Sequence, residues 1–202
     1  MELSQTRPGV VSESPNRRSG RLQFLLIAAV FLGPLLVAAW LYFLGGSLQP
    51  AKRTNHGAVL QPIVNIGEEL PGSPLHEYYV NSWLLLYEHA GTCDDPCRGA
   101  LYTIRQSRLM LGKEMERLKR VFLHGASAPD TVFLGGEHPG LITTQDSSLS
   151  RLLNNKRPTD LPAGGYFLID PLGNLVMYFR PDLEPADMVD DIKHLLRLSR
   201  IG

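Results

Sequence analysis

Residues 79–100 read YVNSWLLLYEHAGTCDDPCRGA, and the pattern of this stretch changes twice along its length. Its first part, 79–87, ends in a continuous apolar run, which is typical of a strand buried on both faces of a sheet. A loop of Gly, Thr and Asp follows, and the two cysteines of the chain, Cys93 and Cys97, stand where this loop leads into the next element. From Pro96 onward, apolar residues recur at helical spacing, and proline is accepted in a first helical turn. The stretch therefore predicts a central strand, a cysteine loop and a helix that runs to about Leu111.

Further strand and helix patterns follow toward the C-terminus. The segment LKRVFLH at 118–124 predicts a second buried strand, and 147–155 predicts a short helix. The segments 165–170 and 175–179 flank the turn signal PLGN, which predicts an antiparallel hairpin. A last helix at 185–198 begins at a proline and carries apolar residues at helical spacing. This order of elements predicts an α/β fold, a mixed sheet flanked by helices on both faces.

A long apolar segment, LQFLLIAAVFLGPLLVAAWLYFL, occupies residues 22–44 and contains no charged side chain. At about 1.5 Å per residue, a helix of this length crosses a bilayer core of roughly 30 Å. The alternative is a cleavable signal peptide, whose apolar region runs about 7–15 residues and ends at small residues. Here Ala38 and Ala39 are followed by the bulky sequence WLYFL. We therefore expect an uncleaved N-terminal transmembrane helix.

The basic residues on either side of this segment predict its orientation. Four arginines precede it, whereas only Lys52 and Arg53 follow it closely. Basic residues favour the cytoplasmic side of a membrane. We therefore expect an inner (cytoplasmic) membrane protein with its N-terminus in the cytoplasm and its C-terminal domain in the periplasm. The expected parts are a disordered cytoplasmic tail at 1–21, the anchor at 22–44, a linker and lead-in at 45–75, and an exported domain at 76–202.

The overall charge excludes one class of partner. The chain has 20 basic and 20 acidic residues, so its formal net charge is zero. A nucleic-acid-binding surface needs a basic excess, so we expect no nucleic-acid partner.

The two cysteines have the spacing and position of a reactive pair. A separation of four residues places both on one helical face, close enough to share a metal ion or to form a disulfide, which an oxidising exported compartment permits. A purely structural disulfide is the alternative, but a bridge over so short a loop stabilises weakly. Cys93 precedes the helix in an exposed loop, so we expect it to be the attacking thiol, with Cys97 as the resolving thiol. Negative charge on Asp94 and Asp95 would oppose a thiolate on Cys93.

These motifs together resemble the Sco/SenC family of membrane-anchored, thioredoxin-fold proteins. The resemblance covers the anchor and most of 55–202. It rests on Cys93-x-x-x-Cys97 after SWLLLY, on the strand RVFLHG, and on the hairpin YFLIDPLGNLV. It implies a thioredoxin-like exported domain that acts in cytochrome c oxidase assembly. It also implies that two CxxxC thiolates and one distant histidine bind copper, and that the dithiol can reduce a disulfide.

The residues of this chain match that pattern only in part. Cys93 and Cys97 match the family's cysteines, so the resemblance makes them both catalytic and metal-binding candidates. The histidine should stand shortly before YFLID, and Pro162 occupies about that position. His89 and His124 are the candidate replacements, because imidazole also suits copper. Thioredoxin-like oxidoreductases commonly have a cis-proline just before this strand, so for Pro162 the cis and trans forms remain equal alternatives.

Two hypotheses for function follow. In the first, the chain is a membrane-anchored thiol–disulfide reductase or copper chaperone that acts on cytochrome c oxidase subunits or other assembly factors. In the second, it is a non-catalytic accessory or assembly subunit of a respiratory oxidase that uses its domain for docking.

Overall fold

The computed structural model describes residues 17–44, 55–127, 129–199 and 201. The chain divides into two units, residues 1–53 and 54–202. Parts of two predicted segments, 1–16 of the tail and 45–54 of the linker, lie outside the described residues.

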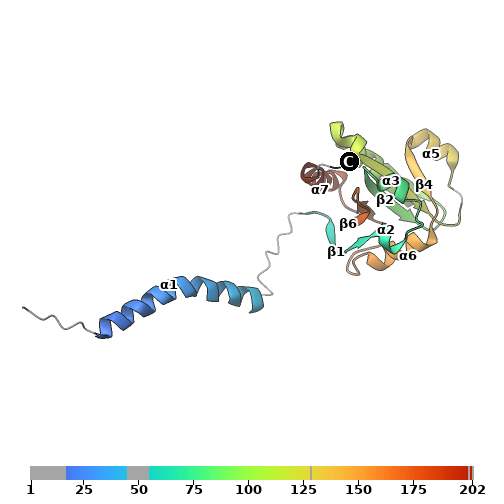
Figure 1. Ribbon diagram of the computed structural model, residues 1–202. Helices are drawn as coiled ribbons and strands as arrows, with labels where there is room; N and C mark the ends of the chain where they lie inside the picture. Colours follow the sequence, from blue (N-terminus) through green and yellow to red (C-terminus); the bar gives the residue numbers. More distant parts are fainter. Residues whose placement is uncertain (1–16, 45–54, 128, 200, 202) are drawn as a thin grey trace, which may run out of the picture. The chain divides into compact units, whose positions relative to one another are not determined.

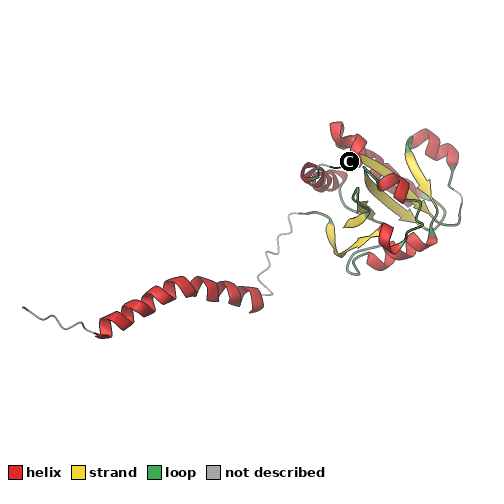
Figure 2. Cartoon of the chain, viewed as in Figure 1, coloured by secondary structure: helices red, strands yellow, loops and turns green. Residues whose placement is uncertain are grey.

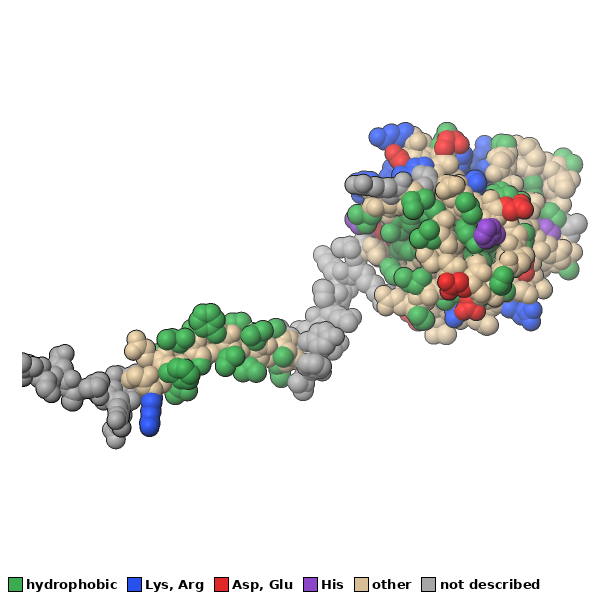
Figure 3. Space-filling model, viewed as in Figure 1, with side chains coloured by type: hydrophobic (Ala, Val, Ile, Leu, Met, Phe, Trp, Pro, Cys, Tyr) green, Lys and Arg blue, Asp and Glu red, His purple; other side chains and the backbone are tan. Residues whose placement is uncertain are grey.

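The first unit contains one long helix, α1 (Arg17–Leu44), with Pro34 inside it (Figure 1). Its segment Gly20–Trp40 is long and apolar enough to cross a membrane. Apolar side chains are exposed around this segment (Figure 3). So large an exposed apolar surface is typical of a membrane or protein contact. The helix contains the whole of the predicted segment 22–44.

The second unit is built on a mixed sheet with helices packed around it (Figure 2). The sheet has six strands in the order β1-β6-β5-β2-β3-β4. Strands β2, β3 and β4 run parallel to one another, whereas the β2–β5, β5–β6 and β6–β1 pairs are antiparallel. The strands are β1 (Ala58–Asn65), β2 (Trp83–His89), β3 (Leu118–His124), β4 (Leu141–Thr144), β5 (Tyr166–Ile169) and β6 (Asn174–Phe179).

Helices pack on both faces of this sheet, as the sequence predicted. One face is covered by α4 (Asp95–Met110) and α7 (Pro185–Leu198), which share a core cluster with Leu85 and Phe122. The other face is covered mainly by α6 (Ser147–Lys156), in a second cluster with Leu84 and Val121. Successive residues of β2 thus enter opposite clusters, as side-chain alternation along a strand requires. The remaining short helices are α2 (Ile66–Glu69), α3 (His76–Tyr79), α5 (Thr131–Glu137) and the 3-10 helix η1 (Gly112–Arg117).

Several element predictions need correction. The predicted strand 79–87 begins four residues later, at Trp83, because Tyr79 ends α3 and Asn81 turns the chain with a φ of 60°. The predicted lead-in contains β1, whose ladder partner β6 lies more than 100 residues away in sequence. Among the described residues, the cis peptide bond is Gln61–Pro62, so the bond before Pro162 is trans.

Candidate functional site

The two cysteines lie at the edge of the sheet where the parallel strands end. In the β2–β3 register, His89 stands opposite His124, so both strands finish at the same level. The loops that follow them are joined by a hydrogen bond, in which the Gly125 amide donates to the His89 carbonyl oxygen at 3.0 Å. Ligands and chemistry in open α/β sheets gather at this carboxyl end. The cysteine loop connects β2 to α4 there.

Helix α4 begins with a side-chain cap and a proline. Asp94 is the N-cap, with an extended backbone, and its Oδ1 accepts the Cys97 amide at 3.2 Å. Pro96 lies in the first turn, where a missing N–H costs nothing. Helix formation thereby fixes Cys97 one turn inside α4 and leaves Cys93 just before the helix.

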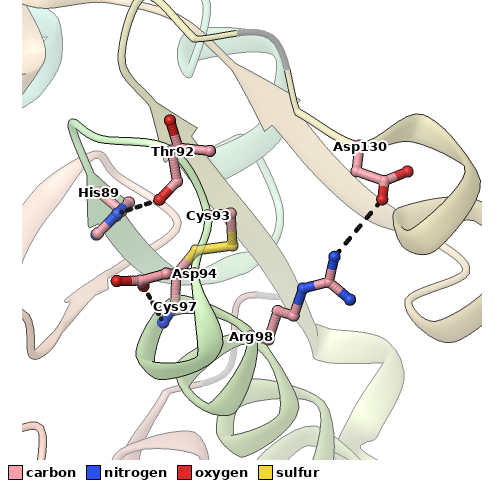
Figure 4. The surroundings of a disulfide bond; sticks show 7 residues. All are labelled: His89, Thr92, Cys93, Asp94, Cys97, Arg98 and Asp130. Atoms are coloured by element: carbon pink, nitrogen blue, oxygen red, sulfur yellow. Dashed lines mark hydrogen bonds and ion pairs between the residues drawn. A yellow bond between two sulfur atoms is a disulfide. The ribbon is translucent and has the colours of Figure 1, made fainter.

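Cys93 and Cys97 form a disulfide, with 5.1 Å between their Cα atoms (Figure 4). Cys97 is fully buried and lies on the face that carries Ala100, Leu101 and Ile104 into the core. Cys93 is half-buried and packs against the edge of the same cluster. The structure therefore gives the predicted difference in exposure between the two sulfurs.

A cavity of about 250 Å³ opens beside Cys93. It lies between α4, the end of β3 and the loop that leads into α5, and its lining includes Cys93, Arg98, Phe122, His124 and Asp130. A partner residue can therefore approach the Cys93 sulfur from this side, whereas the core shields Cys97.

Among the described residues that line the cavity, Arg98 is the cation, and it is already engaged. The Arg98 guanidinium lies 3.6 Å from the Asp130 carboxylate (Figure 4). It also lies 4.3 Å from the centre of the Phe133 ring, a cation–π contact. Sequence reasoning missed Arg98 and Asp130. The position of Arg98 directly after Cys97 was a usable signal, but only the fold brings Asp130 to the site.

The two nearby histidines each use one ring nitrogen for a local hydrogen bond. His89 Nε2 donates to the Thr92 carbonyl oxygen at 3.1 Å, and His124 Nδ1 donates to the Gly125 carbonyl oxygen at 2.8 Å. Because a carbonyl oxygen only accepts, these nitrogens carry the protons of the neutral rings. The free lone pairs are therefore on His89 Nδ1 and His124 Nε2. Only His124 shares the cavity with Cys93.

The position that the resemblance assigns to a histidine is occupied differently here. The Pro162 carbonyl oxygen accepts a hydrogen bond from the Tyr178 hydroxyl at 2.5 Å, and that hydroxyl oxygen accepts the Gly165 amide at 3.0 Å. Burial raises the pKa of Tyr178 above its ordinary value. In the part of the chain that the structure describes, no three His, Cys, Asp or Glu side chains are grouped to hold a metal ion. The described residues therefore do not make up a complete two-cysteine, one-histidine copper site.

A buried phenol lies close to the cysteine loop. Burial raises the pKa of Tyr87 to about 12, with smaller contributions from Tyr166, Asp94 and Glu88. Tyr87 therefore stays protonated over the range in which a thiol ionises, near pH ~8.5. It contributes no charge to the site.

Comparison with known proteins identifies the domain. A family model described as "transmembrane-like, thioredoxin-like, C-terminal domain" matches residues 83–199, and a "transmembrane-like, N-terminal domain" model matches residues 14–45. No curated protein matches the chain in sequence.

Sco proteins are among the solved structures that the chain resembles, as its motifs predicted. Yeast Sco1 with copper bound is 16% identical, with a TM-score of 0.49, over 61% of this chain and 81% of that one. Bradyrhizobium japonicum ScoI with copper bound is 18% identical, with a TM-score of 0.46, over 68% and 98%. Apo Sco1 from Thermus thermophilus is 19% identical, with a TM-score of 0.48, over 73% and 98%.

The two family models together span the long apolar helix and most of the mixed sheet with its cysteine loop. The chain therefore belongs to the family of transmembrane-like proteins with a thioredoxin-like C-terminal domain.

Proposed function

We propose that this protein is a membrane-anchored thiol–disulfide reductase in which Cys93 attacks and Cys97 resolves. The observation that carries the proposal is the asymmetric disulfide at the start of α4: one sulfur borders a cavity and the other is buried. Burial disfavours the thiolate of Cys97, and exposure favours attack by Cys93.

The exchange begins with the reduced pair. The Cys93 thiolate attacks one sulfur of a partner disulfide, the partner's S–S bond breaks, and its second sulfur leaves as a thiolate. Cys97, as a thiolate, then attacks the Cys93 sulfur. This step restores the Cys93–Cys97 bond and releases the partner's first sulfur. Two electrons pass from the chain to the partner, and a separate dithiol must reduce the chain again.

The sequence supports the compartment and the partner that we propose for the protein. We place the domain in the periplasm on a single-pass inner-membrane anchor, because the basic residues favour a cytoplasmic N-terminus. We propose a cytochrome c oxidase subunit or assembly factor as the partner. The CxxxC, RVFLHG and YFLIDPLGNLV motifs and their Sco resemblance support this choice.

We propose that the chain carries Cu(I) as cargo. The reduced pair offers two sulfur ligands, which Cu(I) favours. A third ligand would come from water, from the partner or from a nearby histidine, because Pro162 supplies no imidazole. We therefore expect Cu(I) to bind more weakly than at a site with two cysteines and a histidine.

One experiment with two arms tests these roles. The full chain, purified in detergent and reduced, is mixed with a model peptide disulfide, and we expect one disulfide reduced per chain, with none reduced by Cys93→Ser. In the second arm, the reduced chain competes anaerobically with a chromophoric chelator for Cu(I), beside a Sco protein that has both cysteines and the histidine.

Each result of this experiment has a clear meaning. Cu(I) binding as tight as in that Sco protein, and unchanged by substituting both His89 and His124, would contradict the expected weak site. A chain that neither reduces the disulfide nor binds Cu(I) would support the docking-subunit hypothesis instead.

A further inference from the structure

The cavity beside Cys93 has one positive and one negative side chain in its wall. Among the described residues that line it, these are Arg98, from the start of α4, and Asp130, the N-cap of α5. The other acidic residues of the cysteine loop, Asp94 and Asp95, do not line the cavity. The local contacts of Arg98 and Asp130 therefore decide which charge a partner can use.

The Asp130 carboxylate is already used by the fold. Its Oδ1 accepts the Val132 amide at 3.1 Å and the Phe133 amide at 3.0 Å, and these two hydrogen bonds cap α5. A capping side chain satisfies amides that otherwise lack a partner at the start of a helix. If Asp130 turned toward a cation of a partner, α5 would lose its cap.

The Arg98 guanidinium is held in place, but its N–H groups are unused. It lies 4.3 Å from the centre of the Phe133 ring, and its Nη2 lies 3.6 Å from Asp130 Oδ2 (Figure 4). The second distance is too long for a hydrogen bond, and exposed ion pairs of this kind contribute little. In the described part of the chain, the Arg98 side chain donates no hydrogen bond. Its donors are therefore available to a partner that enters the cavity.

We propose that Arg98 is a specificity-determining residue, which selects partner disulfides that have an acidic side chain close to the attacked sulfur. A guanidinium binds a carboxylate through two parallel N–H donors. The partner's carboxylate replaces the weak contact with Asp130, while the partner's sulfur meets Cys93 in the same cavity. This inference rests on the proposed reductase function and adds the class of partner, a protein whose disulfide is flanked by Asp or Glu.

Exchange at the single thiol of Cys97→Ser tests this selection without a complete reductase cycle. The full chain in uncharged detergent is mixed with disulfide-linked dimers of a short end-capped peptide, in which Glu, Gln or Lys flanks the one cysteine. The Cys93 thiolate bonds to one peptide sulfur, the peptide S–S bond breaks, and the second peptide leaves as a thiolate. Mass spectrometry measures the rate at which the adduct forms.

The readout is the rate with the Glu peptide divided by the rate with the Gln peptide. A change in the ionisation of Cys93 alters both rates equally and cancels in this ratio. Each ratio is then divided by the ratio for 2-mercaptoethanol, a small neutral thiol, which removes any difference in the reactivity of the peptides themselves.

We expect the normalised ratio to exceed one and to fall about fivefold in Arg98→Gln, as loss of one partly exposed ion pair predicts. Arg105→Gln is the matched control. It removes the same charge from the same helix, where Arg105 lies 3.6 Å from Glu137 and does not line the cavity. Its ratio should change by less than about twofold. Asp130→Asn should raise the ratio, because asparagine still caps α5 and no longer competes for Arg98.

Three results would overturn the assignment: an unchanged ratio in Arg98→Gln, an equal fall in Arg105→Gln, or a normalised preference for the Lys peptide over the Glu peptide. Absence of any adduct would overturn it as well, since the cavity would then admit no disulfide. If circular dichroism shows that Cys97→Ser does not fold, the reduced two-cysteine chain gives the same ratios from the peptide thiol released.

The reductase function is tested separately by the same peptides. A two-cysteine chain that fails to complete the reduction, beside a Cys97→Ser chain whose ratio depends on Arg98, would refute the reductase function and leave the selection by Arg98 in place.

Discussion

The local sequence indicates the positions of some residues at this site but not of others. Cys97 is fully buried because it belongs to the apolar face of α4. The helical spacing of the apolar residues in the sequence predicts this face. The capping position of Asp94 is also a local feature, since an aspartate before an apolar helix is a common start signal. The position of Arg98 after Cys97 was a usable signal, but its pairing with Asp130 and the cavity between these two residues could not be predicted. Their contact joins α4 to the loop after β3, and only the folded sheet brings these segments together.

A buried histidine predicts how stability depends on pH. His138 is 2% exposed, and its Nδ1 has no hydrogen-bond partner among the described residues. Burial lowers the pKa of His138, Arg120 and Arg105 lower it further, and Glu137 opposes them. The unfolded chain therefore takes up a proton near pH ~6.5 while the folded chain stays neutral. Stability should be lost as pH falls from that value toward the lower pKa of the folded state.

Thermal unfolding of the full chain in detergent, followed by near-UV circular dichroism from pH 7.5 to 5, checks this expectation. His138→Gln should flatten the decline in melting temperature at acidic pH, and His194→Gln, at an exposed position, is the control. An equally steep decline in His138→Gln would show that other groups cause it.

At the scale of elements, buried strands were predictable and edge strands were not. Strands β2 and β3 are mostly buried because both faces of the sheet are covered there, and β3 has the predicted bounds. The predicted hairpin is present as β5 and β6. Strand β4 has only four residues, none of them fully buried, so its sequence carries little signal. Strand β1 alternates poorly and contains Pro62, which is tolerated at a sheet edge.

The close approach of two loops predicts a glycine requirement. A Cβ at Gly125, after β3, would overlap the carbonyl oxygen of Ala90 in the cysteine loop. We expect Gly125→Ala to lower the free energy of unfolding by about 1–3 kcal/mol, as overpacking does. It should also change the alkylation rate of reduced Cys93, because the loop before it must move.

Gly99→Ala is the matched control for this variant. Gly99 lies inside α4 with open space around its Cβ position, so alanine there should stabilise by about 0.5–1 kcal/mol. Chemical denaturation of the full chain in detergent gives both values. Equal effects of the two variants would mean that the loops do not pack as described.

At the scale of the whole molecule, an apolar helix and an α/β domain occur in one chain. The helix was predictable because a long uncharged apolar segment has few other structures available. The helices on both faces of the sheet were predictable from the order of elements, since each apolar face must be buried. The strand order was not, because β1 and β4 lack a local signal. The orientation in the membrane remains a prediction from flanking charge.

Protease protection tests that orientation. In intact spheroplasts that express the full chain, added protease should degrade the C-terminal domain, because the domain is expected outside the inner membrane. A cytoplasmic marker should survive in the same sample, and detergent-lysed spheroplasts show that the domain is cleavable at all. A domain that stays protected in intact spheroplasts and is cleaved only after lysis would place it in the cytoplasm.

The most direct test of the central claim is capture of the mixed disulfide in cells. The full chain with Cys97→Ser should accumulate a covalent, reductant-sensitive complex on non-reducing gels, because Cys93 can attack but nothing resolves the product. Cys93→Ser should accumulate little or none, since the remaining Cys97 is buried. Accumulation in Cys93→Ser instead would reverse the two roles. If neither variant forms a complex, and oxidase assembly is normal in the double variant, the reductase account is contradicted.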